Sequence, residues 1–275
     1  MVAVHASAPL ALPEGMPPFA APPARPAFSL DDIFRLLGFS VNLPVSTGNH
    51  NDIRFRCQRV PCGRALYRMG HEFENVYVVR LGQLKTVLHG VNGDEHVLSF
   101  PMKGDFLGFD GIYMGRYASD AVALSDAEVL VLPYREILSL GSRYQDFERV
   151  MYAAASREMN RERQLESLQY SLKSEARVAW FIEMQAERFA ALGYSSKNFV
   201  LPMTRRDIGN YLRVSLETVS RSLSALAKAG IIQVQRREIR ILQPALLHSF
   251  RPVRGAPGAA AEQQGVVAAH AQMWT

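Results

Sequence analysis

Residues 204–226 constrain the fold of this chain more than any other stretch, because TRRDIGNYLRVSLETVSRSLSAL reads as two short helices separated by a turn. Thr204 is followed three positions later by Asp207, the arrangement of a capping box at a helix start. Apolar residues then recur at helical spacing, namely Ile208, Tyr211 and Leu212. After the turn, Ser215 can cap a second helix. Within the turn, Arg213 stands where φ is often positive, which costs a non-glycine residue ~1 kcal/mol.

The second predicted helix carries two stripes of opposite character. Its apolar stripe, which must pack inward, consists of Val219, Leu223 and Leu226. Its polar stripe consists of Glu217, Ser220, Arg221 and Ser224. An ordinary solvated helix has the same pattern, but a helix-turn-helix places its second helix in the DNA major groove, where Arg bonds guanine and Glu accepts from cytosine. The preceding helix and the basic surroundings favour DNA, with base contacts from Glu217, Ser220 and Arg221.

The motif IGNYL followed by ETVSR resembles the DNA-binding element of the Crp/Fnr transcription regulators, in particular the Fnr branch. FLGFDGIYMG at 106–115 and the stretch from Ala176 to Gln243 are similar to that branch, so the resemblance covers roughly residues 30–245. It implies an α+β fold with an N-terminal double-stranded β-helix barrel of the cyclic-nucleotide-binding type, a long dimerisation helix and a C-terminal winged helix-turn-helix. The Fnr branch reads TTGAT half-sites through side chains that match Glu217, Ser220 and Arg221. Leu216 replaces an Arg of the Crp branch, which favours Fnr-type sites.

The chain is expected to divide into five segments. Residues 1–27 are rich in Ala and Pro and are predicted to be a disordered arm. Many short apolar segments separated by Gly-containing turns predict a β-barrel sensor domain at 28–140. Residues 141–173 contain the dimerisation helix, and residues 174–250 form the winged helix-turn-helix. Residues 251–275 return to Ala, Gly and Gln and are predicted to be a loose tail.

Positive charge is concentrated near the C-terminus. The segment from Tyr194 to Val253 contains ten basic and three acidic side chains, which gives it a net charge of +7. The whole chain has a net charge of +5, so the rest of the chain has a net charge of −2. Such segregation is typical of a domain that binds phosphate. The expected phosphate contacts are Arg205, Arg206, Arg213, Ser215, Thr218, Lys228, Arg236 and Arg237. No apolar run approaches the ~20 residues that span a bilayer, and the N-terminus lacks a secretory pattern, so we expect a cytoplasmic protein without membrane partners.

An apolar seam in the predicted long helix is suited to pairing with a second copy of the chain. The expected contacts are Tyr152, Ala155, Met159, Glu162 and Leu165, continued by Leu168 and Leu172. The alternative is that this helix only covers its own barrel. A homodimer is favoured because palindromic DNA matches a two-fold axis. Glu162 would lie near its own copy and weaken the pairing, as an Asp does at the matching position of Fnr-type regulators.

The sensor domain lacks the ligands that the resemblance would suggest. Cluster-binding Fnr regulators hold iron and sulfur on three N-terminal cysteines and one barrel cysteine, yet residues 1–56 contain no cysteine and Leu130 occupies the barrel position. The Crp pocket binds the cyclic phosphate with an Arg-Ser pair that follows a Gly-Glu. In this chain Phe109 replaces the Glu, and Tyr117-Ala118 lie near the Arg-Ser position. We therefore expect no iron–sulfur cluster, no cAMP and no metal site, and no cofactor other than the haem alternative given below.

Two sensing alternatives stay open. Cys57 and Cys62 are too few for a disulfide framework but could form a reversible disulfide beside neighbouring arginines. The other alternative is haem ligated by one of the scattered histidines, His71, His89 or His96. A regulator controlled by its own abundance needs neither of these.

The leading hypothesis is a homodimeric transcription regulator, mainly an activator, that binds palindromic TTGAT-like sites in anaerobic, microaerobic or nitrogen-oxide metabolism. Gly93 and Asp94 lie in a loop that resembles the one through which Fnr-type activators touch RNA polymerase. The alternative is a small-molecule- or redox-sensing module in which DNA binding is secondary. We find no nucleophile–base pair, metal-ligand spacing or phosphate-cradling glycine loop, so no enzyme is expected.

Overall fold

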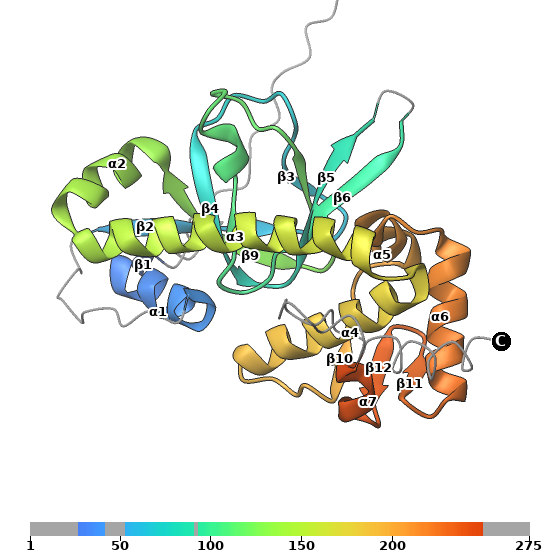
Figure 1. Ribbon diagram of the computed structural model, residues 1–275. Coiled ribbons are helices and arrows are strands. Elements are labelled where there is room, and N and C mark those ends of the chain that lie inside the picture. Colours follow the sequence, from blue (N-terminus) through green and yellow to red (C-terminus); the bar gives the residue numbers. More distant parts are fainter. Residues whose placement is uncertain (1–26, 42–52, 91–92, 250–275) are drawn as a thin grey trace, which may run out of the picture.

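The computed structural model describes residues 27–41, 53–90 and 93–249, so the predicted arm, apart from Ala27, and the predicted tail lie outside the described residues. Figure 1 shows a β-barrel crossed by one long helix, with a smaller helical domain near the C-terminal end of that helix. The succession of a barrel, a long helix and a C-terminal helical domain confirms the α+β architecture expected from the sequence.

The barrel consists of two antiparallel sheets, of order β1-β2-β9-β4-β7 and β3-β8-β5-β6. The strands are β1 (Ala27–Ser29), β2 (Arg54–Val60), β3 (Ala65–Tyr67), β4 (Asn75–Leu81), β5 (Leu84–His89), β6 (Glu95–Ser99), β7 (Phe106–Leu107), β8 (Asp120–Ala123) and β9 (Ala127–Pro133). A short 3-10 helix, η1 (Phe109–Gly111), follows β7. Alternating strand residues point inward and form a continuous apolar interior, as period-2 side-chain geometry requires.

Three helices pack against the first sheet. These are α1 (Leu30–Val41), α2 (Tyr134–Arg143) and α3 (Gln145–Ser171), and their apolar faces share one buried cluster with β2, β4 and β9. The long helix begins at Gln145 rather than at 141, because the backbone of Tyr144 is extended and separates α2 from α3. None of the helices among the described residues is long and apolar enough to cross a membrane.

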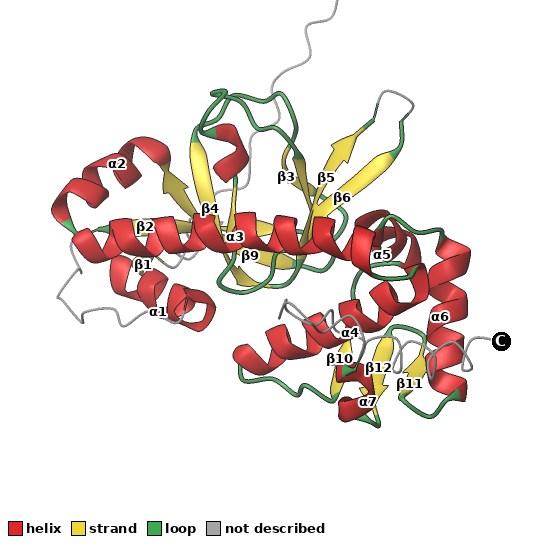
Figure 2. Cartoon of the chain, in the orientation of Figure 1, coloured by secondary structure: helices red, strands yellow, loops and turns green. Residues whose placement is uncertain are grey.

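The C-terminal domain contains a compact winged helix-turn-helix. Its elements are α4 (Ser174–Ala191), β10 (Asn198–Val200), α5 (Arg205–Leu212), α6 (Leu216–Lys228), β11 (Ile232–Gln235), β12 (Glu238–Ile241) and α7 (Pro244–His248). Strands β10, β12 and β11 form a small antiparallel sheet, and β11 and β12 make a hairpin around Arg236 and Arg237. Figure 2 shows this sheet beside α4, α6 and α7.

The barrel and the C-terminal domain share an apolar core. Val87 and Val97 of β5 and β6 belong to the same buried cluster as the inner faces of α4, α5 and α6. The ring of Phe100 lies 5.1 Å from that of Tyr211 and 5.9 Å from that of Phe181, measured between centroids. The C-terminal domain therefore has a defined position on the β5–β6 hairpin.

Candidate DNA interface

The start of α5 is fixed by the capping box that the sequence predicts. Thr204 Oγ1 accepts from the Asp207 backbone N–H at 3.1 Å, and Asp207 accepts from the Thr204 N–H at 2.8 Å. Asp207 has a further partner that the sequence does not reveal, since Lys85 Nζ of β5 lies 2.8 Å from Asp207 Oδ1 and 2.9 Å from Glu95. These bonds lower the pKa of Asp207 and raise that of Lys85, although burial acts in the opposite direction on both groups.

The turn between α5 and α6 has the geometry of a helix-turn-helix. Arg213 adopts φ 53°, which confirms the left-handed conformation expected at this position. Gly209 was not singled out from the sequence, yet a Cβ there would lie 2.7 Å from the carbonyl oxygen of Val214. Ser215 Oγ accepts from the Thr218 N–H at 3.1 Å and caps α6. The missing Cβ at Gly209 lets the turn approach α5 closely, and the Ser215 cap fixes the start of α6.

The two stripes of α6 lie as predicted. Val219, Leu223 and Leu226 are at most 5% exposed, whereas Glu217 and Arg221 are exposed and Ser220 is partly exposed. Nη1 of Arg205 donates to Ser220 Oγ at 3.2 Å, so the serine hydroxyl hydrogen is left to donate elsewhere. The trio therefore presents an acceptor, a hydroxyl and a guanidinium on one open helix face.

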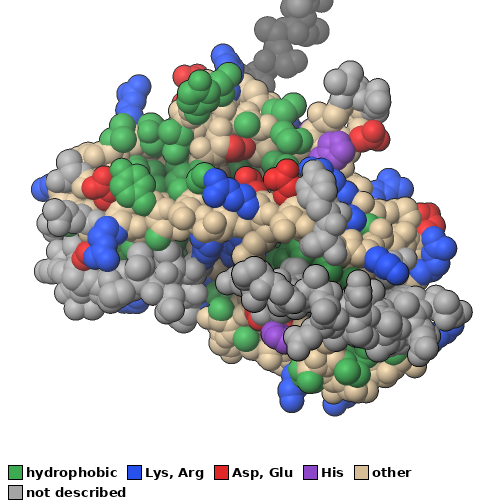
Figure 3. Space-filling view, in the orientation of Figure 1, with side chains coloured by type: hydrophobic (Ala, Val, Ile, Leu, Met, Phe, Trp, Pro, Cys, Tyr) green, Lys and Arg blue, Asp and Glu red, His purple; other side chains and the backbone are tan. Residues whose placement is uncertain are grey.

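Exposed positive charge surrounds this face. Arg205, Arg206, Arg213, Lys228, Arg236 and Arg237 are all exposed, while Ser215 and Thr218 lie at the start of α6. A hollow of about 340 Å³ lies between α5, α6 and the hairpin, and Arg205, Arg236 and Arg237 line it. Figure 3 shows several Lys and Arg side chains at the end of the molecule where α5 and α6 lie in Figure 1, besides others elsewhere on this face. This arrangement of cations is suited to binding DNA phosphates on either side of α6.

The seam on α3 is divided between solvent and the protein's own core. Tyr152 is 66% exposed and Met159 53% exposed; Glu162 is also exposed. Ala155 and Leu165 are partly buried, and Leu165 packs against the C-terminal domain. The extension of the seam to Leu168 is wrong, because Leu168 is 2% exposed and packs within its own chain. Burial and the charges of Glu158 and Asp110 raise the pKa of Glu162.

Three aromatic side chains stack inside the barrel. The Tyr67 and Tyr117 rings stack at 4.0 Å and the Tyr67 and Tyr77 rings at 5.8 Å, centroid to centroid. All three side chains are at most 6% exposed. The Tyr117 hydroxyl donates to the carbonyl oxygen of Asn75 at 2.8 Å. The stack belongs to the buried apolar cluster inside the barrel.

The sensing candidates in the barrel are scattered. Cys57 is partly buried, and burial together with Glu128 raises the pKa of its thiol, whereas Cys62 is exposed. His71 and His96 are exposed, and His89 Nε2 lies 3.3 Å from Asp120. Within the described ranges, no three His, Cys, Asp or Glu side chains are grouped as metal ligands. Gly93 and Asp94 are exposed beside β6, with the loop closed by a 2.7 Å bond from the Gly90 N–H to the Asp94 carbonyl oxygen.

Comparison with known proteins agrees with this geometry. Residues 176–250 match the Crp-like helix-turn-helix domain, and residues 57–144 match the cyclic nucleotide-binding domain. The transcriptional regulatory protein btr of Bordetella pertussis is 41% identical over 188 residues, which cover 67% of this chain and 76% of btr. The chain belongs to the Crp/Fnr family. It is therefore a DNA-binding transcription regulator and not an enzyme.

Two further relatives of this Crp/Fnr regulator support the assignment. The fumarate and nitrate reduction regulatory protein of Escherichia coli is 34% identical over 179 residues, which cover 65% of this chain and 72% of that protein. The structure of FixK2 from Bradyrhizobium japonicum matches with a TM-score of 0.67 at 24% identity, covering 74% of this chain and all of that one. The FixK2 match concerns the fold alone.

Proposed function

We propose that this regulator binds palindromic TTGAT-like sites as a homodimer and acts mainly as an activator in anaerobic, microaerobic or nitrogen-oxide metabolism. The proposal rests on one observation above all, the exposed trio of Glu217, Ser220 and Arg221 on a helix whose opposite face is buried. The E. coli relative is a fumarate and nitrate reduction regulatory protein, which supports the proposed metabolic context.

Base readout and phosphate binding are assigned to different side chains in this proposal. Arg221 can bond guanine O6 and N7 together, Glu217 can accept from cytosine, and Ser220 can donate to a base acceptor because Arg205 already donates to its oxygen. The exposed cations around α5, the turn and the wing supply affinity that does not depend on sequence.

The uncovered part of the α3 seam supports the proposed homodimer. Tyr152 and Met159 expose large apolar side chains on the outer face of the long helix. Pairing two copies there would bury both and place two recognition helices about one two-fold axis. Contact with RNA polymerase is proposed at Gly93 and Asp94, which are exposed in the β5–β6 loop.

We further propose that the barrel works without an iron–sulfur cluster, cAMP or haem. This proposal is supported by the stacked side chains of Tyr67, Tyr77 and Tyr117, which occupy part of the barrel interior. The raised pKa of Cys57 argues against a reactive thiolate at that position. An absorption spectrum of protein purified without oxygen should show no visible band, and a chromophore in that spectrum would refute this part of the proposal.

Arg221→Ala and Arg206→Ala form a matched pair for testing the DNA proposal. Arg221→Ala should reduce the preference for a TTGAT palindrome over a scrambled site by roughly 5- to 150-fold, the equivalent of ~1–3 kcal/mol. Arg206→Ala should weaken binding to both sites alike and lower the slope of log K against log salt by ~1. Titrations followed by fluorescence anisotropy would measure both. A wild-type specificity ratio in Arg221→Ala would contradict the base-contact assignment.

A further inference from the structure

A largely buried lysine of the barrel is bonded to the first helix of the helix-turn-helix. Lys85 Nζ of β5 lies 2.8 Å from Asp207 Oδ1 of α5 and 2.9 Å from Glu95 Oε2 of β6. The side chains of Lys85 and Asp207 are 13% and 8% exposed, so water screens this ion pair less than a surface pair. Because the ion pair is also a hydrogen bond, it has a preferred direction.

Asp207 divides its two carboxylate oxygens between the two domains. Its Oδ2 accepts from the backbone N–H of Thr204 at 2.8 Å and from the Thr204 hydroxyl at 2.6 Å, within the capping box of α5. Its Oδ1 accepts from Lys85. The carboxylate that caps α5 is therefore also attached to the barrel. It lies two positions after Arg205, which donates to Ser220 of α6.

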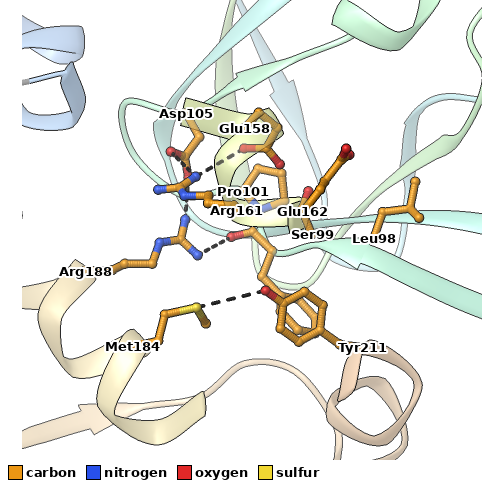
Figure 4. A pocket seen from close by; sticks show the side chains of 11 residues that line it. Leu98, Ser99, Pro101, Asp105, Glu158, Arg161, Glu162, Met184, Arg188 and Tyr211 are labelled. Carbon is orange, nitrogen blue, oxygen red and sulfur yellow. Dashed lines mark hydrogen bonds and ion pairs between the residues drawn. The ribbon is translucent and has the colours of Figure 1, made fainter. Parts of the chain in front are cut away.

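A second contact holds the next turn of α5. The ring of Phe100, which follows β6, lies 5.1 Å from that of Tyr211, measured between centroids. Figure 4 shows Tyr211 of α5 and Arg188 of α4 approaching the barrel segment that contains Pro101. Nη1 of Arg188 donates to the carbonyl oxygen of Phe100 at 3.0 Å, so α4 reinforces the contact at this point.

The two contacts with α5 lie side by side on the β5–β6 hairpin. Thr86 pairs with Ser99, so Lys85 lies opposite Phe100 as the antiparallel register continues. Side chains opposite one another in such a pair are ~4.5–5.5 Å apart at Cβ. Their partners on α5 are four positions apart, a spacing of ~5–6 Å on a helix. Because the two spacings match, the hairpin fixes the direction of α5 as well as its position.

The covalent connection does not fix this direction by itself. Helix α3 ends at Ser171 and α4 begins at Ser174, and the backbone of Leu172 and Lys173 between them is extended. Such a connection leaves several rotatable backbone angles between the two helices. The apolar contact at Phe100 is non-directional, as hydrophobic contacts are. The orientation of the helix-turn-helix therefore depends on directed bonds, and Lys85 supplies one to α5.

We propose that Lys85 is a positioning residue that determines the spacing between the two DNA half-sites. This inference rests on the proposed homodimer, in which the pairing of two chains sets one distance and one angle between the recognition helices. One base pair added to the spacer moves a half-site by ~3.4 Å and rotates it by ~35° about the DNA axis. A helix-turn-helix whose direction is fixed by Lys85 does not follow that rotation, so one spacing is preferred.

The spacing preference can be measured by fluorescence anisotropy with palindromes whose spacers differ by one base pair. The wild type should prefer one spacing over its neighbours by roughly tenfold or more. Lys85→Met keeps an unbranched side chain but removes the charge, and it should reduce this preference roughly five- to tenfold. Its preference for a TTGAT half-site over a scrambled one should remain that of the wild type. Arg68→Met is the matched control, because it removes a 2.9 Å ion pair with Asp120 that lies within the barrel.

Hydrogen exchange tests the same role without DNA. Backbone amides at the start of α5 should exchange roughly tenfold faster in Lys85→Met, because α5 separates from the hairpin more often, and should be unaffected in Arg68→Met. If Lys85→Met does not fold, Lys85→Gln, which can still donate to Glu95, replaces it and should act in the same direction.

The outcomes distinguish this inference from the DNA proposal. A wild-type spacing preference or wild-type exchange in the Lys85 variant, or equal changes in Arg68→Met, would overturn the role of Lys85. Absence of any preference for TTGAT in the wild type would instead refute the proposed site, and the exchange comparison would still decide whether Lys85 positions α5.

Discussion

Replacing Asp105 by Asn should destabilise the fold strongly, although the two side chains are nearly the same size. Contacts with Arg188, Arg161 and Arg157 lower the pKa of Asp105 from its ordinary 3.8 to about 2, against the opposing effect of burial. A difference of nearly two units corresponds to about 2.4 kcal/mol of stability at neutral pH. Asn also removes the carboxylate charge that Arg157, Arg161 and Arg188 share, and breaking a buried ion pair costs ~3–5 kcal/mol. We therefore expect a loss of between about 2.4 and 5 kcal/mol.

The same ion pairs predict how stability depends on pH. Because the folded-state pKa of Asp105 lies below its unfolded value, its contribution is complete above the unfolded pKa and is lost as pH falls through the folded pKa. For the wild type this loss should occur between about pH 4 and pH 2. Asp105→Asn should lack this component.

Urea unfolding followed by circular dichroism would measure both effects. Asp126→Asn is the matched control, since it removes the same charge from an exposed pair with Arg59 at 3.1 Å. Its transition midpoint should stay close to that of the wild type. If Asp105→Asn and Asp126→Asn have equal midpoints, the buried cluster does not stabilise the fold as we argue.

Three further changes test the helix-turn-helix and the α3 seam. Arg213→Gly should raise the free energy of unfolding by about 1 kcal/mol, because glycine adopts the observed φ of 53° without strain; a lower midpoint in urea would contradict this. Ser215→Ala should cost about 1 kcal/mol through loss of the α6 cap, and an unchanged midpoint would show that the cap contributes nothing. Met159→Glu should shift the chain toward monomer in sedimentation velocity, while Arg163→Gln on the same helix should not; a wild-type dimer in Met159→Glu would remove this residue from the proposed interface.

The DNA-binding unit could be predicted in detail because its determinants are close in sequence. The capping bonds of Thr204, Asp207 and Ser215 span three residues, and the buried and exposed stripes of α6 follow from the helical repeat. The left-handed turn at Arg213 is likewise a local property. The long helix was predicted less well at its ends, since the extended backbone at Tyr144 has no strong sequence marker.

Tertiary structure alone decided which distant residues meet. Lys85 and Asp207 are 122 positions apart, and Asp105 and Arg188 are 83 positions apart, so neither ion pair follows from spacing. Leu168 shares the periodicity of the seam but is buried within the single chain, which spacing along the helix does not reveal. By itself the sequence determined the helices, their caps and their faces, since these depend on neighbours within one or two turns. How the barrel, α3 and the DNA-binding domain fit together depends on side chains brought into contact only by folding.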